Sequence, residues 1–356
     1  MNKKLNRIIS TVITGIILTA AFYFILTVEH RDAWPRKRVT AESGYREIMG
    51  TFARIMAVAT DKQTAQISIE KGLERLERVD NLMSVHNPDS EISRVNREAD
   101  TRPVKVSDPL FEVLQRSVQD SRLTDGAFDI TVGPLVDLWY EAGKNNTKPT
   151  EDQIASAKAK VGYQKLILDS ENKTVRFTVD GMKLDLGGIA KGYGIDLAAD
   201  AMQKAGALGG MVDVGGDIRF FGAPPRGKQK WLVGLQEPKI DNKGNVSQNL
   251  VLTLQVLDKA VTTSGDYRRF VLIDGKRYSH IINPSTSSAA EGLSSVTIIA
   301  QNATEADALA TAVSVMGKEK GLAFIEKIPD TEAILISSAP QFEQTRTTGA
   351  AQYIKK

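Results

Sequence analysis

Apolar side chains recur along this chain at helical spacing in several segments. In residues 64–83 they recur every three or four positions, with Ile69, Leu73, Leu76 and Val79 on one face, which is typical of an amphipathic helix. The same periodicity and the usual end signals, such as a capping box, predict further helices. These lie at residues 110–118, 150–161, 194–205 and 304–316.

Other segments alternate apolar and polar side chains, which predicts strands. These segments are residues 51–59, 165–169, 175–179, 182–186, 211–214, 218–221, 231–235, 250–257, 270–273, 277–282 and 295–300. Two Asp-Gly pairs, Asp180–Gly181 and Asp274–Gly275, separate neighbouring strands and have the composition of two-residue hairpin turns. We therefore expect two clear hairpins.

Composition changes this picture by excluding several classes of protein. The chain has 356 residues, of which 42% are apolar, so it is long and apolar enough to bury a large core. Its 46 basic and 43 acidic residues give a net charge of +3, and this near balance argues against nucleic acid as a partner. The absence of cysteine excludes disulfides, thiolate metal sites and a cysteine nucleophile.

The amino terminus has the pattern of a membrane anchor. Three basic residues precede an uncharged, mostly apolar run at residues 8–28, which is long enough to span a bilayer as a helix. A cleaved signal peptide is the alternative. We expect residues 1–28 to be a transmembrane anchor or signal segment, residues 29–44 a linker, and residues 45–356 a domain outside the membrane. The expected location is a bacterial inner membrane, with the domain facing the periplasm.

The most suggestive chemistry lies in residues 184–196, which predict a strand end, a glycine turn and a helix start. Backbone N–H groups in such a turn could hold phosphate, Lys191 could add a positive charge, and Asp185 could accept a hydrogen bond or assist a cation. A tight structural turn with a solvated lysine explains the same residues. A second glycine turn ends at Asp217, and the two turns would converge if their strands pair.

Other polar residues also have two interpretations. Asp307 and Thr311 are four residues apart on a predicted helix, so one face would present a carboxylate and a hydroxyl to Mg²⁺. The helix alone explains them too, since threonine can bond back to a helical carbonyl. His86 could be an exposed loop histidine, and Phe128 could simply be a core residue in a turn.

Taken together, the motifs resemble the FAD:protein FMN transferases, the ApbE or flavin transferase family, over roughly residues 45–341. The matching blocks occur in the family's order. They are Met49-Gly50-Thr51, Met83-Ser84 with residues 90–96, residues 124–131, 184–196 and 215–217, Thr263-Ser264-Gly265-Asp266-Tyr267, residues 279–284 and 306–311. The expected fold is α+β, with a mixed, mainly antiparallel sheet flanked by helices.

The resemblance implies an enzyme that transfers FMN from FAD to a threonine or serine hydroxyl of an acceptor protein, with AMP as the leaving product and Mg²⁺ as cofactor. The acceptor it suggests is a subunit of a membrane electron-transfer complex. It also implies which residues form the site. The Mg²⁺ ligands would be Gly188 through its main chain, Asp307 and Thr311, and the FAD contacts would be Met49, His86, Ala127, Phe128, Asp129, Asp185, Lys191 and Ile282.

A neutral histidine could take the proton of the acceptor hydroxyl, so we expect His280 to be the base, with Asp185 as its rival. Three residues depart from the family pattern: His86 replaces a frequent tyrosine, Asn283 a frequent aspartate, and Ser287 the usual glycine. Two other functions fit the same residues: an FAD pyrophosphatase that uses water as the acceptor, and a membrane-tethered flavin-binding protein without turnover.

Overall fold

The computed structural model describes residue 34, residues 37–240 and residues 245–355. The chain divides after Arg38, and one compact unit begins at Val39. The predicted membrane span at residues 8–28 lies outside the described residues. Among the residues that are described, no helix has both the length and the apolar character needed to cross a membrane.

The largest sheet has nine strands, and all of its strand pairs are antiparallel. Its order is β1-β3-β7-β8-β11-β14-β15-β16, with β2 paired to β3. The strands are β1 (Val39–Glu42), β2 (Arg46–Ile48), β3 (Thr51–Ala59), β7 (Gly209–Val214), β8 (Asp217–Gly222), β11 (Ala260–Gly265), β14 (Leu293–Ala300), β15 (Glu332–Ser337) and β16 (Gln344–Arg346). Strand β1 falls within the segment predicted to be a linker.

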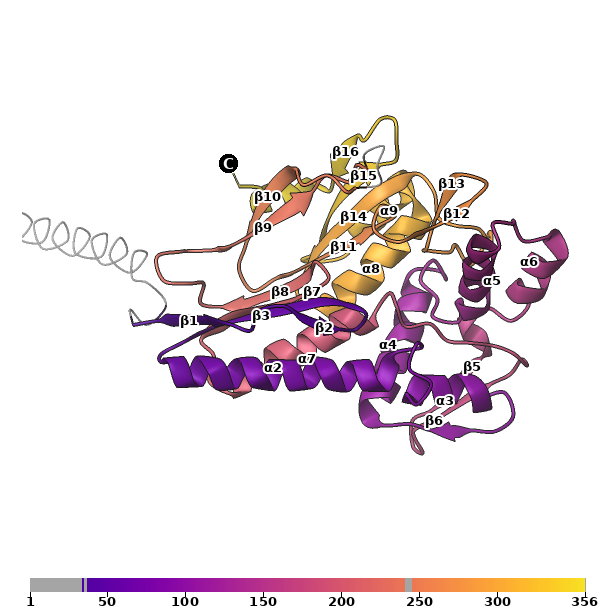
Figure 1. Cartoon of the computed structure of the whole chain (residues 1–356), viewed down its shortest axis with the longest axis horizontal. Coiled ribbons are helices and arrows are strands. Elements are labelled where there is room, and N and C mark those ends of the chain that lie inside the picture. Colours follow the sequence, from indigo (N-terminus) through magenta and orange to yellow (C-terminus); the bar gives the residue numbers. More distant parts are fainter. Residues whose placement is uncertain (1–33, 35–36, 241–244, 356) are drawn as a thin grey trace, which may run out of the picture. The chain divides into compact units, whose positions relative to one another are not determined.

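Three helices cover one face of this sheet: α2 (Lys62–Met83), α7 (Ala190–Lys204) and α8 (Ala303–Met316) (Figure 1). The hydrophobic core lies between them and the sheet, where Ala57, Met202 and Ile298 are fully buried. The apolar spacing predicted the amphipathic helix α2, and its apolar stripe faces α7 and the sheet. Helix α9 (Lys318–Ile325) and the short 3₁₀ helix η2 (Thr348–Tyr353) pack near β15.

A second group of elements surrounds a separate apolar cluster. It contains α3 (Glu91–Glu98), α4 (Asp108–Leu123), η1 (Tyr163–Lys165) and a three-stranded sheet of β4 (Val104–Lys105), β6 (Thr174–Phe177) and β5 (Leu166–Asp169). Beside it, α5 (Gly133–Lys144) and α6 (Glu151–Lys158) pack with the hairpin of β12 (Phe270–Ile273) and β13 (Lys276–Ser279).

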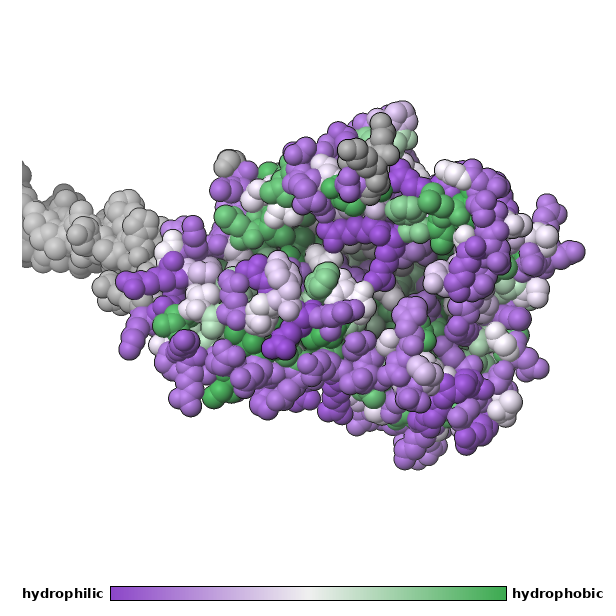
Figure 2. Space-filling view, viewed as in Figure 1, coloured by the Kyte–Doolittle hydropathy of each residue, from purple (hydrophilic) through white to green (hydrophobic). Residues whose placement is uncertain are grey.

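The last two-stranded sheet joins β9 (Trp231–Gln236) to β10 (Leu250–Val256). Figure 2 shows hydrophobic residues gathered over β9 and β10 and again over β12 and β13, with a recessed, hydrophilic area between them. Leu232, Leu250 and Leu272 are exposed on these strands. The two patches therefore flank the recess.

The structure confirms one predicted hairpin and corrects the other. Asp274 and Gly275 both have positive φ, and they join β12 to β13 as predicted. Residues 182–186 do not form a strand paired with β6. They run extended and buried in alternation, but the backbone of Leu184 is held by the side chain of Asn96, with N···O distances of 2.8 and 2.9 Å. The segment also contacts residues 130–132 through its main chain: the N–H of Asp185 donates to the carbonyl oxygen of Ile130 at 2.7 Å, and Lys183 forms a parallel bridge with Val132. Distant partners, which periodicity cannot reveal, therefore replace the expected neighbouring strand.

The start of α7 is also earlier than predicted. The helix begins at Ala190 rather than near Gly194, so Lys191 lies in its first turn and not in the preceding loop. Its glycines had suggested a longer turn. Inside the helix, Gly192 lets the backbone of Ala303 pack closely, and Gly194 lies against the side chains of Met49, Leu76 and Val79.

A buried carboxylate in α4 should make stability depend on pH. Burial raises the pKa of Asp120 to about 6, while its ion pair with Arg116 opposes the rise. The folded state therefore holds this proton more tightly than the unfolded chain, and stability should fall as the pH rises from about 4 to about 6. The cost above that range is at most about 3 kcal/mol.

We therefore expect Asp120→Asn to raise the free energy of unfolding at pH 7.5 and to have a much smaller effect near pH 4.5, measured by urea unfolding. Asp125→Asn, an exposed substitution just past the same helix, is the matched control and should change little at either pH. An equal effect of Asp120→Asn at both pH values would contradict the assignment.

Candidate active site

The site is built where the first turns of α7 and α8 meet. A side chain at position 192 would place its Cβ 2.2 Å from the carbonyl oxygen of Ala303, so only glycine fits there. The carboxylate of Asp196 accepts hydrogen bonds from the backbone N–H groups of Ala303 and Thr304 at 2.9 and 2.8 Å. Arg219 holds the same carboxylate at 2.9 Å. These contacts fix the start of α8 against α7.

Lys191 lies at the centre of this junction. It pairs with Asp217, whose side chain is buried, and Asp217 also accepts a hydrogen bond from the backbone N–H of Thr263 at 2.9 Å. The two glycine turns therefore converge, as predicted, and Lys191 is not simply a solvated lysine. Burial opposes its charge, but the carboxylates of Asp217 and Asp307 outweigh burial and raise the pKa of Lys191.

Asp307 faces Lys191 from α8. Its side chain is buried, and one oxygen accepts a hydrogen bond from the backbone N–H of Gly192 at 3.0 Å. Within the described residues, its other oxygen accepts no hydrogen bond. Burial raises the pKa of Asp307, and the like charge of Asp217 adds to the rise. A carboxylate oxygen that accepts no hydrogen bond, on a side chain that is buried as a whole, favours a cation as its neighbour.

Thr311 lies one helical turn beyond Asp307 and touches the glycine turn. A Cβ built on Gly188 would lie 2.7 Å from Thr311 Oγ1 and 3.3 Å from the ring of Phe128. In the described part of the chain the hydroxyl of Thr311 makes no hydrogen bond, so it does not bond back to a helical carbonyl. The structure therefore brings the three predicted metal ligands, Gly188, Asp307 and Thr311, to one place.

This donor set fits a hard cation. Mg²⁺ usually takes one or two carboxylates and completes its oxygen shell with water and substrate phosphates. Asp307 supplies the carboxylate, Thr311 a hydroxyl and Gly188 nearby main chain. Over the described residues, no cluster of three or more histidine, cysteine, aspartate or glutamate side chains is suited to a metal. Such a cation would therefore depend on the substrate for further ligands.

His280 follows β13, and its protonation can be assigned. Its Nδ1 lies 2.9 Å from the backbone carbonyl oxygen of Arg269. Because a carbonyl only accepts, Nδ1 carries the hydrogen, and Nε2 keeps a free lone pair. Partial enclosure by protein and the charges of Arg269 and Lys191 lower the pKa of His280 below its ordinary value, although the ring also reaches solvent. The imidazole is therefore neutral at pH 7.

Two predicted carboxylates already have structural partners. One oxygen of Asp185 accepts a hydrogen bond from the backbone N–H of Gly187 at 2.7 Å, which stabilises the glycine turn. Asp129 is buried, and both of its oxygens accept backbone N–H groups, from Thr131 at 2.8 Å and from Tyr163 at 2.9 Å. Burial raises the pKa of Asp129, and these hydrogen bonds oppose that rise. Asp129 therefore shapes the loop that carries Phe128.

The remaining predicted flavin contacts lie on several separate segments. Met49 has a positive φ and packs beside Gly194 of α7, and Ala127 is partly buried next to Phe128. Ile282 is buried in the apolar cluster under α5. His86 is exposed in the loop between α2 and α3, and no contact within the described residues joins it to the other predicted residues.

Sequence reasoning missed several residues that organise the site. Asp217, Asp196 and Arg269 were not among the predicted site residues, although Asp217 follows two glycines and could have been suspected as the partner of Lys191. Asp196 and Arg269 carry no local signal. Their partners are 107 and 11 residues away along the chain, at Ala303 and His280, so only the fold reveals them.

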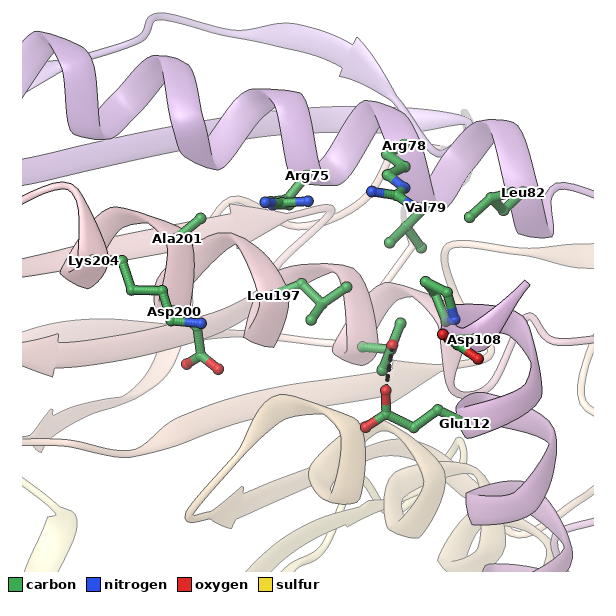
Figure 3. A pocket seen from close by; sticks show the side chains of 12 residues that line it. Arg75, Arg78, Val79, Leu82, Asp108, Glu112, Leu197, Asp200, Ala201 and Lys204 are labelled. Atoms are coloured by element: carbon green, nitrogen blue, oxygen red, sulfur yellow. Dashed lines mark hydrogen bonds between the residues drawn. The ribbon is translucent and has the colours of Figure 1, made fainter. Parts of the chain in front are cut away.

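A separate cavity of about 250 Å³ lies between α2, α4 and α7 (Figure 3). It contains a hydrogen bond of 2.8 Å from the Tyr193 hydroxyl to Glu112. Its charged lining residues are Arg75, Arg78, Asp108, Glu112, Asp200 and Lys204. Charges of both signs surround the cavity and none of the predicted site residues lines it, so it has no part in the chemistry of the junction.

The loop at residues 283–288 contains two of the departures from the family pattern. The side-chain oxygen of Asn283 accepts the backbone N–H of Ser285 at 2.9 Å, which an aspartate would do equally well. Ser287 has a φ of 61°, and its buried hydroxyl has no hydrogen-bond partner. The glycine expected at this position would avoid both the left-handed strain and the unpaired hydroxyl.

With this geometry in view, comparisons with known proteins give a consistent result. The model of the ApbE family matches residues 49–335. The FAD:protein FMN transferase of Escherichia coli (strain K12) is 33% identical over 346 residues, which cover 93% of this chain and 96% of that protein. The FAD:protein FMN transferase of Vibrio cholerae is 32% identical over 315 residues, or 86% of this chain and 91% of that protein.

The structural comparison agrees with the sequence comparison. The crystal structure of the ApbE protein from Thermotoga maritima superposes with a TM-score of 0.79 at 30% identity. The superposition covers 89% of this chain and 100% of that one. The family match at residues 49–335 contains the three covering helices and the junction between α7 and α8.

The strained loop gives a stability prediction. Ser287→Gly should raise the free energy of unfolding by about 1 kcal/mol, because relief of the left-handed conformation and of the unpaired hydroxyl exceeds the extra chain entropy of glycine. Thermal unfolding would measure it. Ser287→Ala removes only the hydroxyl and should gain less, so equal gains from both variants would show that backbone strain contributes nothing.

Proposed function

Because the chain belongs to the ApbE family and is a transferase, we propose that it moves the FMN part of FAD onto a threonine or serine hydroxyl of an acceptor protein. The observation that carries this proposal is the junction itself. There, Lys191, the carboxylate of Asp307 and the hydroxyl of Thr311 lie near main chain at Gly188, which has no side chain to block a phosphate or a metal.

The reaction forms one phosphoester bond and breaks one phosphoanhydride bond. The acceptor oxygen attacks the flavin-side phosphorus, and the bridging oxygen leaves with AMP. Negative charge grows on the phosphate oxygens during this step, so fixed positive charge nearby stabilises the transition state. Lys191 has one partner, Asp217, and its ammonium group has further donors to direct at the substrate.

Asp307, Thr311 and the main chain at Gly188 are the residues that would hold Mg²⁺. When bound, the ion would neutralise charge on the phosphate oxygens. The protein contributes the rest of the arrangement: Gly188 leaves space for a ligand to approach Thr311, and Gly192 fixes one oxygen of Asp307, so that the other is free.

His280 serves as the base in this proposal. Its neutral imidazole holds Nδ1–H on the carbonyl of Arg269, so Nε2 is the atom that takes the proton of the acceptor hydroxyl. Asp185 is the weaker candidate, because one of its oxygens is committed to the backbone of Gly187. Asp185 is better suited to a hydrogen bond with the flavin nucleotide.

The other proposed flavin contacts are Met49, His86, Ala127, Phe128, Asp129, Lys191 and Ile282. Phe128 supports this role because its ring lies beside Gly188. Asp129 would act mainly by shaping the loop, since its oxygens already accept backbone hydrogen bonds.

The proposed cellular arrangement rests on the sequence. We propose that residues 1–28 anchor the protein in a bacterial inner membrane or direct its export, and that residues 45–356 form the transferase domain on the periplasmic side. The basic start followed by an apolar run supports this. An acceptor subunit of a membrane electron-transfer complex would then lie on the same side.

Incubation of the full chain with FAD, Mg²⁺ and a candidate acceptor separates the three possible functions. We expect flavin fluorescence on the denatured acceptor, together with AMP. Free FMN and AMP without labelled acceptor would identify a pyrophosphatase. FAD binding without AMP would identify a flavin-binding protein and would contradict the transferase assignment.

Two variants test the roles of the base and the metal ligand. His280→Ala should leave FAD binding nearly unchanged and slow transfer by about 10²–10⁴-fold. Asp307→Asn should remove the Mg²⁺ dependence along with activity, while Glu305→Gln on the same helix should have little effect. Transfer assays with FAD binding measured in parallel would check both, and wild-type transfer rates in both site variants would refute the assignments.

A further inference from the structure

Arg269 occupies a position that no predicted role explains. It lies between β11 and β12, and its guanidinium donates to the carbonyl oxygen of Gly50 at 3.3 Å. Its own carbonyl holds Nδ1 of His280 at 2.9 Å. The residue therefore ties the turn between β2 and β3 to the proposed base.

The positive charge of Arg269, near His280, is not balanced by a carboxylate within the described part of the chain. Two positive charges lower the pKa of His280: Arg269, from the segment before β12, and Lys191, from the first turn of α7. Arg269 and Lys191 also repel each other. Lys191 is compensated by Asp217, whereas none of the described carboxylates lies within ion-pair distance of Arg269. Arg269 has a neutral base and a second cation as neighbours, so an anion bound there would stabilise its positive charge.

The neighbouring arginine provides a contrast. Arg268 donates to the carbonyl oxygen of Gly215 at 2.9 Å and to the side chain of Gln236 at 2.8 Å, and its guanidinium lies 5.7 Å from the ring of Tyr267. Its donors therefore already have protein partners. Arg269 has a single, long hydrogen bond and leaves most of its donors available.

We infer that Arg269 is a further catalytic residue, whose guanidinium binds the flavin-side phosphate of FAD while that phosphate is transferred. This inference rests on the proposed function. The acceptor hydroxyl must lie against Nε2 of His280 to give up its proton, so the phosphorus that it attacks lies beside the same ring. The backbone carbonyl oxygen of Arg269 accepts a hydrogen bond from Nδ1 of that ring, so residue 269 lies beside it.

The role of Arg269 in the step follows from the charge balance. As the acceptor oxygen bonds to phosphorus, its proton passes to Nε2 of His280, and the electron pair of the broken phosphoanhydride bond leaves on the bridging oxygen of AMP. The non-bridging oxygens of the transferred phosphate are then flanked by Arg269 on the side of the base and by Lys191 on the side of α7. A planar guanidinium suits two such oxygens at once.

Substitutions of the two neighbouring arginines test this inference in the full-length protein. Arg269→Gln should lower kcat for FMN transfer by about 10²–10³-fold, with a smaller rise in KM for FAD. Arg269→Lys keeps the charge and should retain part of the rate. Arg268→Gln removes an equal charge one residue away and should stay close to the wild type.

Histidine NMR supplies a readout that a purely structural role would not move. The chain has three histidines, and the His280 signal is the one missing in His280→Gln. Arg269→Gln keeps the backbone carbonyl but removes a positive charge, so it should raise the pKa of His280, whereas Arg268→Gln and Arg269→Lys should not. An unchanged pKa, or a rate equal to that of Arg268→Gln, would overturn the inference. A lower melting temperature alone, with both readouts unmoved, would assign Arg269 only to holding Gly50.

Failure of the proposed function would be seen separately. If the wild type labels no acceptor, inorganic pyrophosphate can be titrated while the His280 signal is followed. At least tenfold weaker pyrophosphate binding by Arg269→Gln than by Arg268→Gln would still support a phosphate site at Arg269. Equal binding by the two variants would overturn it.

Discussion

The close contact between the start of α7 and the start of α8 is the constraint on which the site depends. Gly192 lets the backbone of α7 approach the carbonyl of Ala303, and Asp196 caps α8 from within α7. Together they set the distance between Lys191 and Asp307. A larger residue at position 192 would separate the helices and, with them, the two charged groups.

The junction has an excess of negative charge in one part and an excess of positive charge in another. Around Lys191, the buried carboxylates of Asp217, from β8, and Asp307, from α8, share one lysine, so this cluster has an excess of negative charge. On the side of β12, the neutral His280 faces two cations. A metal ion and a phosphate group would balance both excesses at once, which is why a phosphoryl-transfer reaction suits the geometry better than simple flavin binding does.

The departures from the family pattern have different structural weights. Asn283 does what an aspartate would do, because its side-chain oxygen accepts the backbone of the loop that follows. Ser287 places an L-residue in a left-handed conformation and buries a hydroxyl without a partner. His86 is exposed, and it makes no hydrogen bond or ion pair with another described residue.

The sequence alone determined the elements and the chemistry carried by local motifs. Apolar spacing predicted α2 and α8, the Asp-Gly pair at Asp274 predicted the hairpin of β12 and β13, and helical spacing placed Asp307 and Thr311 on one face, because each depends on neighbours within a few residues. The tertiary structure alone decided that residues 182–186 are held by Asn96, that Asp217 compensates Lys191, and that Arg269 fixes the tautomer of His280. Those contacts join segments that local patterns treat separately, and burial there gives each charge its energetic weight.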